Sequence, residues 1–185
     1  MAGINYPFNP IRSGLGVGIP VKRKVFISYH HDNDQYYYNE FSRIFSQSFE
    51  IFHDNSLDRA IDSTNSEYLN RKIREDYIIG SSITIVLCGS EAYKRRWIDW
   101  EIHATLYHKH GLLGIILPTC QQNFESKYLV PDRLVDNVNS GYARWILWTN
   151  DSNLLKLEIE TAVKNSKSNA ALIVNSSPKM KRSLS

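Results

Sequence analysis

A tryptophan and a glutamate stand four residues apart in the stretch RRWIDWEIHATL, residues 95–106. In a helix this spacing puts Trp97 and Glu101 on one face. An indole beside a carboxylate suits an electron-poor ring and a ribose, because the carboxylate accepts hydrogen bonds from sugar hydroxyls and stabilises positive charge at an anomeric carbon. The alternative is an ordinary exposed helix glutamate. The same periodicity predicts that Trp100 is buried in the core and that Asp99 faces solvent.

Three cations, Lys94, Arg95 and Arg96, come directly before this helix. Their charge and the helix N-terminus both favour a bound anion nearby. A solvated basic turn has the same composition, and for each arginine alone we favour that interpretation.

A second group of polar residues follows the apolar run KVFIS, residues 24–28. If this run is a strand, it delivers Ser28, Tyr29 and His30 to its carboxyl end. Our hypothesis is that these residues contact a ligand together with the helix that carries Trp97. The alternative is a turn in which Asp32 or Asp34 caps the next helix, and both interpretations of this loop stay open.

Several other chemistries lack their motifs. His30 and His31 are adjacent, so both rings cannot easily bind one metal ion from a strand or helix, and we predict no metal site. The glycine-rich GLGVG, residues 14–18, follows no strand, which argues against a dinucleotide-binding or phosphate-binding glycine loop. No GxSxG hydrolase motif is present, and Cys88 and Cys120 form no metal or redox motif.

A phosphate-accepting receiver domain would share an alternating strand–helix pattern. It needs an aspartate at the end of the third strand and an acidic pair after the first. Asp32 and Asp34 could form the pair, but the third apolar run ends in VLCGS without an aspartate. We therefore reject this class.

Strand and helix patterns alternate along the chain, which predicts an α/β domain with a five-stranded parallel sheet and helices on both faces. The run SITIVLC is almost continuously apolar, as expected of a central strand buried on both sides. In such sheets ligands bind beyond the carboxyl ends of the strands. We expect strands at 24–28, 49–52, 82–88, 112–118 and 144–148, and helices at 34–48, 63–80, 96–111 and 150–165. A long polar loop fills 119–143.

The composition fits one globular domain. The chain has 185 residues, 42% of them hydrophobic, and a net charge of +3, which is too small to argue for nucleic acid. No apolar run approaches the ~18 residues of a membrane span, and no secretory signal is evident, so we expect a cytoplasmic protein that binds neither nucleic acid nor membrane.

Three segments are expected: a flexible N-terminal arm (1–22), the domain (23–166) and a C-terminal tail (167–185). We expect the end, NSSPKMKRSLS, to be frayed. Whether AALIV, residues 170–174, docks on the domain stays open.

The stretches KVFISYHHDND, SSITIVLCGSEAYKRRWIDWEIHATL and GLLGIILP together resemble the TIR domain. The resemblance is to the short TIR-like proteins of bacteria and archaea, including the NAD-cleaving sensor subunits of Thoeris anti-phage systems, and it covers roughly residues 22–165. It implies a flavodoxin-like sheet. Enzymatic members carry a glutamate after the third strand with a tryptophan four residues before it, and Trp97 and Glu101 match that pair.

The resemblance further implies cleavage of the bond between nicotinamide and ribose in NAD, with NAD as substrate and no cofactor. Glu101 would then be catalytic, and Ser28, Tyr29, His30 and Trp97 would bind substrate. We add Asp54 and Ser56, in the loop after the second strand, as contacts at the rim. The product could be ADP-ribose, a cyclic isomer or a base-exchanged conjugate.

A second class of function stays open. Many TIR domains are scaffolds for protein–protein interaction and perform no catalysis. A lone TIR-like unit either releases a diffusible signal or associates with copies of itself or with a partner protein, and members of the family often complete their site between neighbouring protomers. A scaffold does not need a carboxylate beside an indole, so Glu101 separates the two hypotheses.

Overall fold

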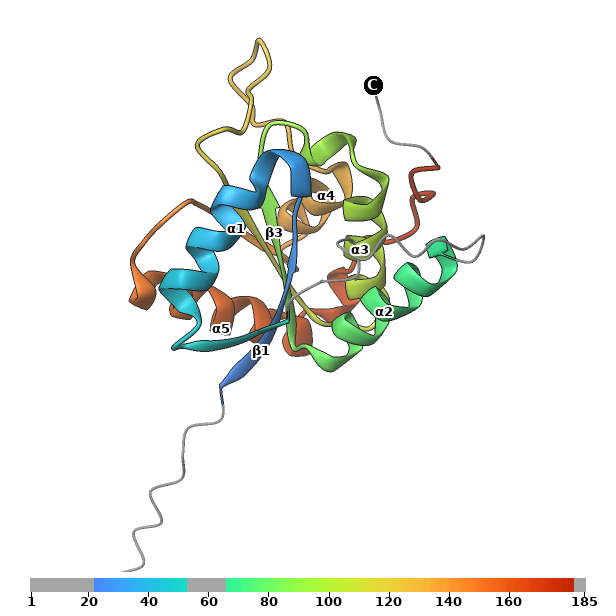
Figure 1. Cartoon of the computed structure of the whole chain (residues 1–185). Helices are drawn as coiled ribbons and strands as arrows, with labels where there is room; N and C mark the ends of the chain where they lie inside the picture. The colour runs from blue at the N-terminus through green and yellow to red at the C-terminus, as the bar shows by residue number, and fades with distance from the viewer. Residues whose placement is uncertain (1–21, 53–65, 182–185) are drawn as a thin grey trace, which may run out of the picture.

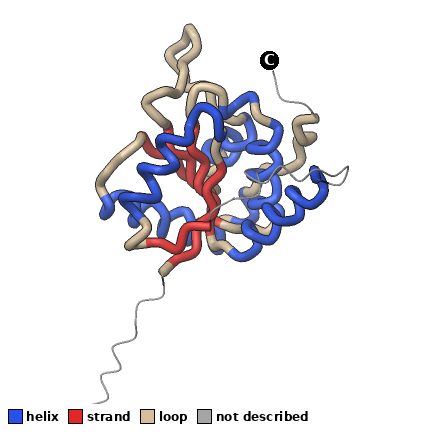
Figure 2. The backbone as a smooth tube through the Cα atoms, viewed as in Figure 1, coloured by secondary structure: helices blue, strands red, loops and turns tan. Residues whose placement is uncertain are grey.

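A parallel sheet lies between two layers of helices in the computed structural model, which describes residues 22–52 and 66–181 (Figures 1 and 2). The strands are β1 (Arg23–Ser28), β2 (Phe49–Phe52), β3 (Ile83–Cys88), β4 (Gly111–Ile116) and β5 (Arg144–Leu147). The α-helices are α1 (His31–Phe45), α2 (Ser66–Gly80), α3 (Arg96–Tyr107), α4 (Asp132–Asn139) and α5 (Ser152–Ser168), and short 3-10 turns lie at Ala92–Lys94 and Ala170–Leu172.

The strand order is β2-β1-β3-β4-β5, and every neighbouring pair is parallel. This confirms the predicted five-stranded flavodoxin-like sheet. From β1 the chain first adds β2 on one side and then β3 on the other. Ligands of such folds bind at this switch of direction, beyond the carboxyl ends of β1 and β3. The order therefore points to the neighbourhood of Ser28, the last residue of β1.

The two faces of the sheet have separate cores. On one face α1 and α5 bury aromatic and aliphatic side chains against β1, β3 and β4. On the other face α3 and α4 pack on β3 and β4, and α2 packs against α3 and β1 (Figure 1). All six residues of β3 are buried, which confirms the central position that its apolar run predicted.

The first helix begins earlier than expected, at His31. His30 occupies the N-cap position and makes no capping hydrogen bond through its side chain. Asp32 and Asp34 therefore lie inside the helix, so the interpretation of either as its cap is wrong.

Helix α4 interrupts the segment that was predicted to be a polar loop. It follows Pro131, which cannot donate a backbone hydrogen bond and often precedes or opens a helix. Its eight residues carry too short a pattern to stand out, and its buried set includes the polar Arg133 and Asn137 beside Leu134. The prediction of a loop over 119–143 is therefore wrong for residues 132–139.

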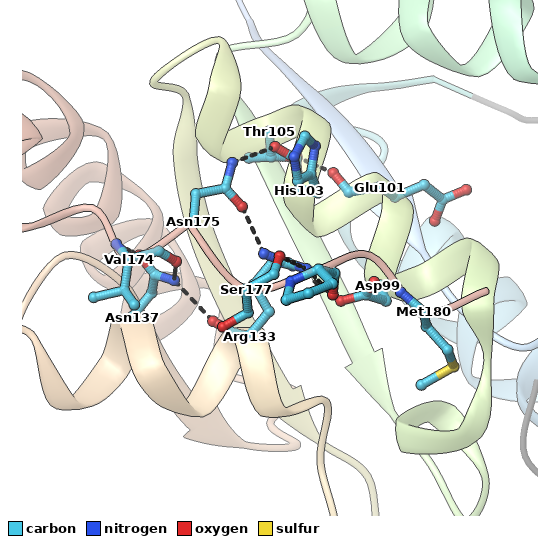
Figure 3. Close-up of polar contacts among 11 residues, drawn as sticks. Asp99, Glu101, His103, Thr105, Arg133, Asn137, Val174, Asn175, Ser177 and Met180 are labelled. Carbon is cyan, nitrogen blue, oxygen red and sulfur yellow. Dashed lines mark hydrogen bonds and ion pairs between the residues drawn. The ribbon is translucent and has the colours of Figure 1, made fainter. Parts of the chain in front are cut away.

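The C-terminal segment departs from the prediction of a frayed end. Helix α5 continues to Ser168, two residues past the predicted domain boundary, and residues 169–180 then lie along α3 and α4 (Figure 3). The Asn137 amide donates to the carbonyl oxygen of Val174 at 2.8 Å and accepts from its N–H at 3.0 Å. Polar side chains on α3 and α4 thus hold the backbone of this segment, and Ile173 packs against the core beneath these helices.

None of the described helices is long and apolar enough to cross a membrane.

Replacing Asn137 with alanine should release the C-terminal segment. The substitution removes both bonds to Val174, and each net hydrogen bond is worth about 1 kcal/mol. We expect the free energy of unfolding to fall by about 2 kcal/mol and the Val174 amide to exchange with solvent faster. Asn139→Ala, at an exposed position of the same helix, is the control. Equal exchange at Val174 in the two variants would contradict the docking.

Candidate functional site at the carboxyl ends of β1 and β3

Glu101 is a buried carboxylate, with only 3% of the residue exposed. One oxygen accepts a hydrogen bond from the hydroxyl of Ser28 at 2.5 Å. The other forms an ion pair with Arg74 of α2, whose residue is 4% exposed. The alternative of an exposed helix glutamate is therefore wrong. The contacts bring together β1, α2 and α3 at the switch point of the sheet.

Arg74 was not foreseen from the sequence, although it carries one signal. It stands four residues before the fully buried Ile78, so both lie on the face of α2 that packs inward. An arginine on the buried face of a helix indicates a buried acidic partner. The guanidinium carbon of Arg74 also lies 5.1 Å from the centroid of the Trp97 ring, within cation–π range. Arg74 thus links the two residues that the sequence paired.

Trp97 and Trp100 lie on the same side of α3 with their rings edge to face, 6.1 Å apart. Both are half-buried, so the prediction that Trp100 is a core residue is only partly met. Together they line a hollow of about 170 Å³. Asp99 does not face solvent as predicted, because its side chain is 13% exposed and pairs with Arg133 at 2.9 Å.

Ser28 and Tyr29 point to opposite faces of the sheet. Successive side chains of a strand alternate, and Ser28 faces α2 and α3 through Glu101. Tyr29 is 9% exposed and belongs to the core beneath α1, where its ring stacks on Tyr38 at 4.4 Å. The structure therefore does not bring Tyr29 to Glu101, and its predicted contact with substrate has no support in this arrangement.

His30 lies in the loop that follows β1 and is close to the residues that follow β3. Its Nε2 lies 3.6 Å from a carboxylate oxygen of Asp32, and its Nδ1 is buried without a hydrogen-bond partner among the described residues. Burial lowers the pKa of His30, and so does the charge of Arg95, whereas Asp32 and Glu91 raise it. A neutral imidazole at this rim can accept or donate a hydrogen bond.

The cations before α3 are engaged locally. Arg95 pairs with Glu91, and Lys94 lies 3.9 Å from the same carboxylate. This favours the interpretation of a basic turn for these two residues. Arg96 differs, because its guanidinium carbon lies 5.0 Å from the Trp97 ring and it lines the hollow there.

Two predicted contacts, Asp54 and Ser56, lie outside the residues that the structure describes. Within the described ranges, no group of three or more His, Cys, Asp or Glu side chains could hold a metal ion.

Asp34 is the second buried carboxyl at this edge, with 0% of the residue exposed. Neither of its oxygens accepts a hydrogen bond of good geometry from the described residues. It fills the space beside Gly89, where any Cβ would fall 1.9 Å from a carboxyl oxygen. Burial raises the pKa of Asp34 to about 6; the nearby His30 backbone lowers it in part, and Glu91 raises it.

A flavodoxin-like sheet with a buried acid at its switch point defines the chain as an α/β domain of the kind that binds ligands beyond its strands. A family model described as "Thoeris protein ThsB, TIR-like domain" matches residues 26–122, which are 97 of the 185 residues and include the end of β1 and all of β3 and α3. The chain belongs to this family of Thoeris TIR-like domains. The suspected relationship is confirmed.

Two solved structures are similar at low identity. A 2-deoxyribosyltransferase of Bacillus psychrosaccharolyticus is 15% identical, with a TM-score of 0.44, over 50% of this chain and 71% of the other. The CMP N-glycosidase of Clostridium botulinum is 13% identical, with a TM-score of 0.47, over 75% of this chain and 99% of the other. Likeness at this level carries no statement about activity. A comparison with curated proteins found no match.

The raised pKa of Asp34 predicts a pH-dependent cost to folding. Between about pH 4 and pH 6 the unfolded chain has already lost this proton while the folded chain keeps it, so rising pH favours unfolding through this group. Asp34→Asn should remove the effect and stabilise the protein more at pH 7 than at pH 4.5. Urea unfolding at the two pH values measures it, with the exposed Asp132→Asn as control. Parallel pH curves for wild type and Asp34→Asn would refute the assignment.

Proposed function

We propose that this domain cleaves the bond between nicotinamide and ribose in NAD, with Glu101 as the catalytic residue. The observation that carries the proposal is the buried Glu101 carboxylate, oriented by Ser28 and Arg74 at the switch point of the sheet. The family to which the chain belongs supports the same chemistry. No cofactor is required, because NAD is the substrate.

The reaction places little demand on proton transfer. When the bond between the anomeric carbon and the pyridine nitrogen breaks, its electron pair goes to the nitrogen, and nicotinamide leaves as a neutral molecule. The ribose becomes an oxocarbenium-like cation. A fixed negative charge beside the anomeric carbon stabilises that cation, and its carboxylate oxygens accept hydrogen bonds from the ribose hydroxyls.

Ser28 and Arg74 explain how the carboxylate is ready before substrate arrives. Electrostatic stabilisation is most effective when the charged group needs no reorganisation during the reaction. A hydroxyl and a guanidinium on separate elements hold the two oxygens of Glu101 in one orientation. Burial also excludes water, which strengthens the interaction of this charge with the developing cation.

Capture of the cation decides the product. Water gives ADP-ribose and releases a proton to solvent, whereas a nucleophile within the same molecule gives a cyclic isomer. We expect the product to be a nucleotide signal in anti-phage defence. We further expect self-association, or an effector protein that responds to the product.

Glu101→Gln should lower the rate of NAD cleavage about 100- to 1000-fold, because the neutral amide keeps the shape but not the charge. Liquid chromatography with mass detection of nicotinamide and its partner product measures the rate. Glu125→Gln, at an exposed loop position, is the control and should match wild type. Identical product traces from wild type and Glu101→Gln would leave the interaction module as the better function.

Ser28→Ala should lower kcat about tenfold with a small change in KM, since it removes one hydrogen bond that orients Glu101 without removing the charge. Ser168→Ala, at an exposed position of α5, controls for loss of a hydroxyl elsewhere. A change in KM alone would show that Ser28 acts by binding substrate and has no part in orienting Glu101.

A further inference from the structure

The C-terminal segment, residues 169–180, is held against α3 and α4 by one buried arginine (Figure 3). Arg133 is 3% exposed and donates to Asp99 at 2.9 Å, to the side chain of Asn175 at 2.9 Å, and to the carbonyl oxygens of Ser177 and Pro178 at 3.0 and 3.2 Å. A buried guanidinium that donates to all these acceptors strongly constrains the position of the backbone of the C-terminal segment.

The segment is fixed on both sides of Lys179. Pro178 precedes it and accepts from Arg133, and the N–H of Met180 follows it and donates to Asp99 at 2.7 Å. Asn175 adds a bond to the backbone oxygen of His103 at 3.1 Å. Lys179 therefore has a defined place beside α3 although it lies near the end of the described chain.

That place is the hollow of about 170 Å³ beside Trp97. Two indoles, three cations and a methionine line it: Arg71, Arg96, Trp97, Trp100, Lys179 and Met180. Among the described residues, neither Arg71 nor Lys179 forms an ion pair with a carboxylate. The positive charges also act on His103. Burial is the largest cause that lowers the pKa of His103, and the charges of Lys179, Arg133 and Arg71 lower it further, whereas Asp99 raises it.

Cations gathered around aromatic faces suit an anionic group attached to a ring or a sugar. The hollow is smaller than the roughly 300–1,000 Å³ of sites that enclose whole ligands. It therefore fits one part of a dinucleotide. Trp97 lines the hollow and contacts Arg74, which pairs with Glu101, so two side chains connect the hollow to the proposed catalytic group.

We propose that this hollow is a subsite for the diphosphate of a nucleotide, and that the C-terminal segment completes it by supplying Lys179. The inference rests on the proposed function for the identity of the substrate. The subsite itself is assigned from the cations, the indoles and the anchored segment. Lys179 and Arg71 contact the phosphate oxygens, and Arg133 positions Lys179 from behind.

Calorimetric titration with ADP at low salt tests the subsite. Lys179→Met keeps most of the side-chain volume but removes the charge, and we expect it to weaken ADP binding about tenfold. Lys164→Met, at an exposed position of α5, should bind ADP as wild type does. The affinity for adenosine, which lacks phosphate, should be the same in wild type and Lys179→Met. Equal ADP affinity in wild type and Lys179→Met would overturn the proposal.

A second variant tests the role of the segment. Asn175→Ala removes a bond to Arg133 and a bond to α3, and we expect it to weaken ADP binding about threefold. In the double variant, adding Lys179→Met should lower the affinity for ADP by a smaller factor than Lys179→Met does alone, because Asn175 acts on binding through the position of Lys179. If the loss of ADP affinity in the double variant equals the product of the losses in the two single variants, the segment does not position Lys179.

Turnover of NAD, measured on the same proteins, separates the two proposals. If Glu101→Gln abolishes cleavage while Lys179→Met leaves ADP binding intact, the proposed function is supported and the proposed subsite is wrong. If wild type fails to cleave NAD but ADP binding depends on Lys179, the subsite is supported and the proposed reaction is wrong.

Discussion

The buried ion pair between Glu101 and Arg74 is the constraint on which this site depends. A charge removed from water is costly unless a partner of opposite charge and further hydrogen bonds replace its hydration. Here the partner comes from α2 and the hydrogen bond from Ser28 at the end of β1. The pair therefore joins three elements at the place where the topology already opens a crevice. Removing either partner alone would leave a buried charge without its partner in this ion pair.

The alternation of side chains along β1 divides the rim of the sheet into two functional sides. Ser28 faces Glu101 and the helices that carry the indoles, whereas Tyr29 faces the core beneath α1. Asp34, Gly89 and His30 lie where the loops after β1 and β3 meet. The acid–arginine pair and the buried Asp34 are thus separate charged groups with different surroundings. Among the residues that the structure describes, Glu101 has a cation as its partner and Asp34 has none.

The sheet could be predicted from the sequence because its strands are apolar runs with clear ends, and β3 is the clearest of them. The pairing of Trp97 with Glu101 on one helix face followed from their spacing. Helix α4 and the C-terminal segment could not be predicted in the same way. The C-terminal segment is held by Arg133, Asn137 and Asn175 through bonds to backbone atoms, and such bonds leave no periodic pattern. Arg74 was missed because the partner that explains it is 27 residues away.

The proposed reaction requires the anomeric carbon of bound NAD to lie beside Glu101. The structure of a complex with carbocyclic NAD, which lacks the ring oxygen and resists cleavage, measures this most directly. The account predicts hydroxyls of the nicotinamide-bearing ring within hydrogen-bond reach of the Glu101 carboxylate, about 2.6–3.2 Å. A ligand seated elsewhere, with Glu101 still enclosed by Ser28 and Arg74 and touching none of it, would contradict the central claim.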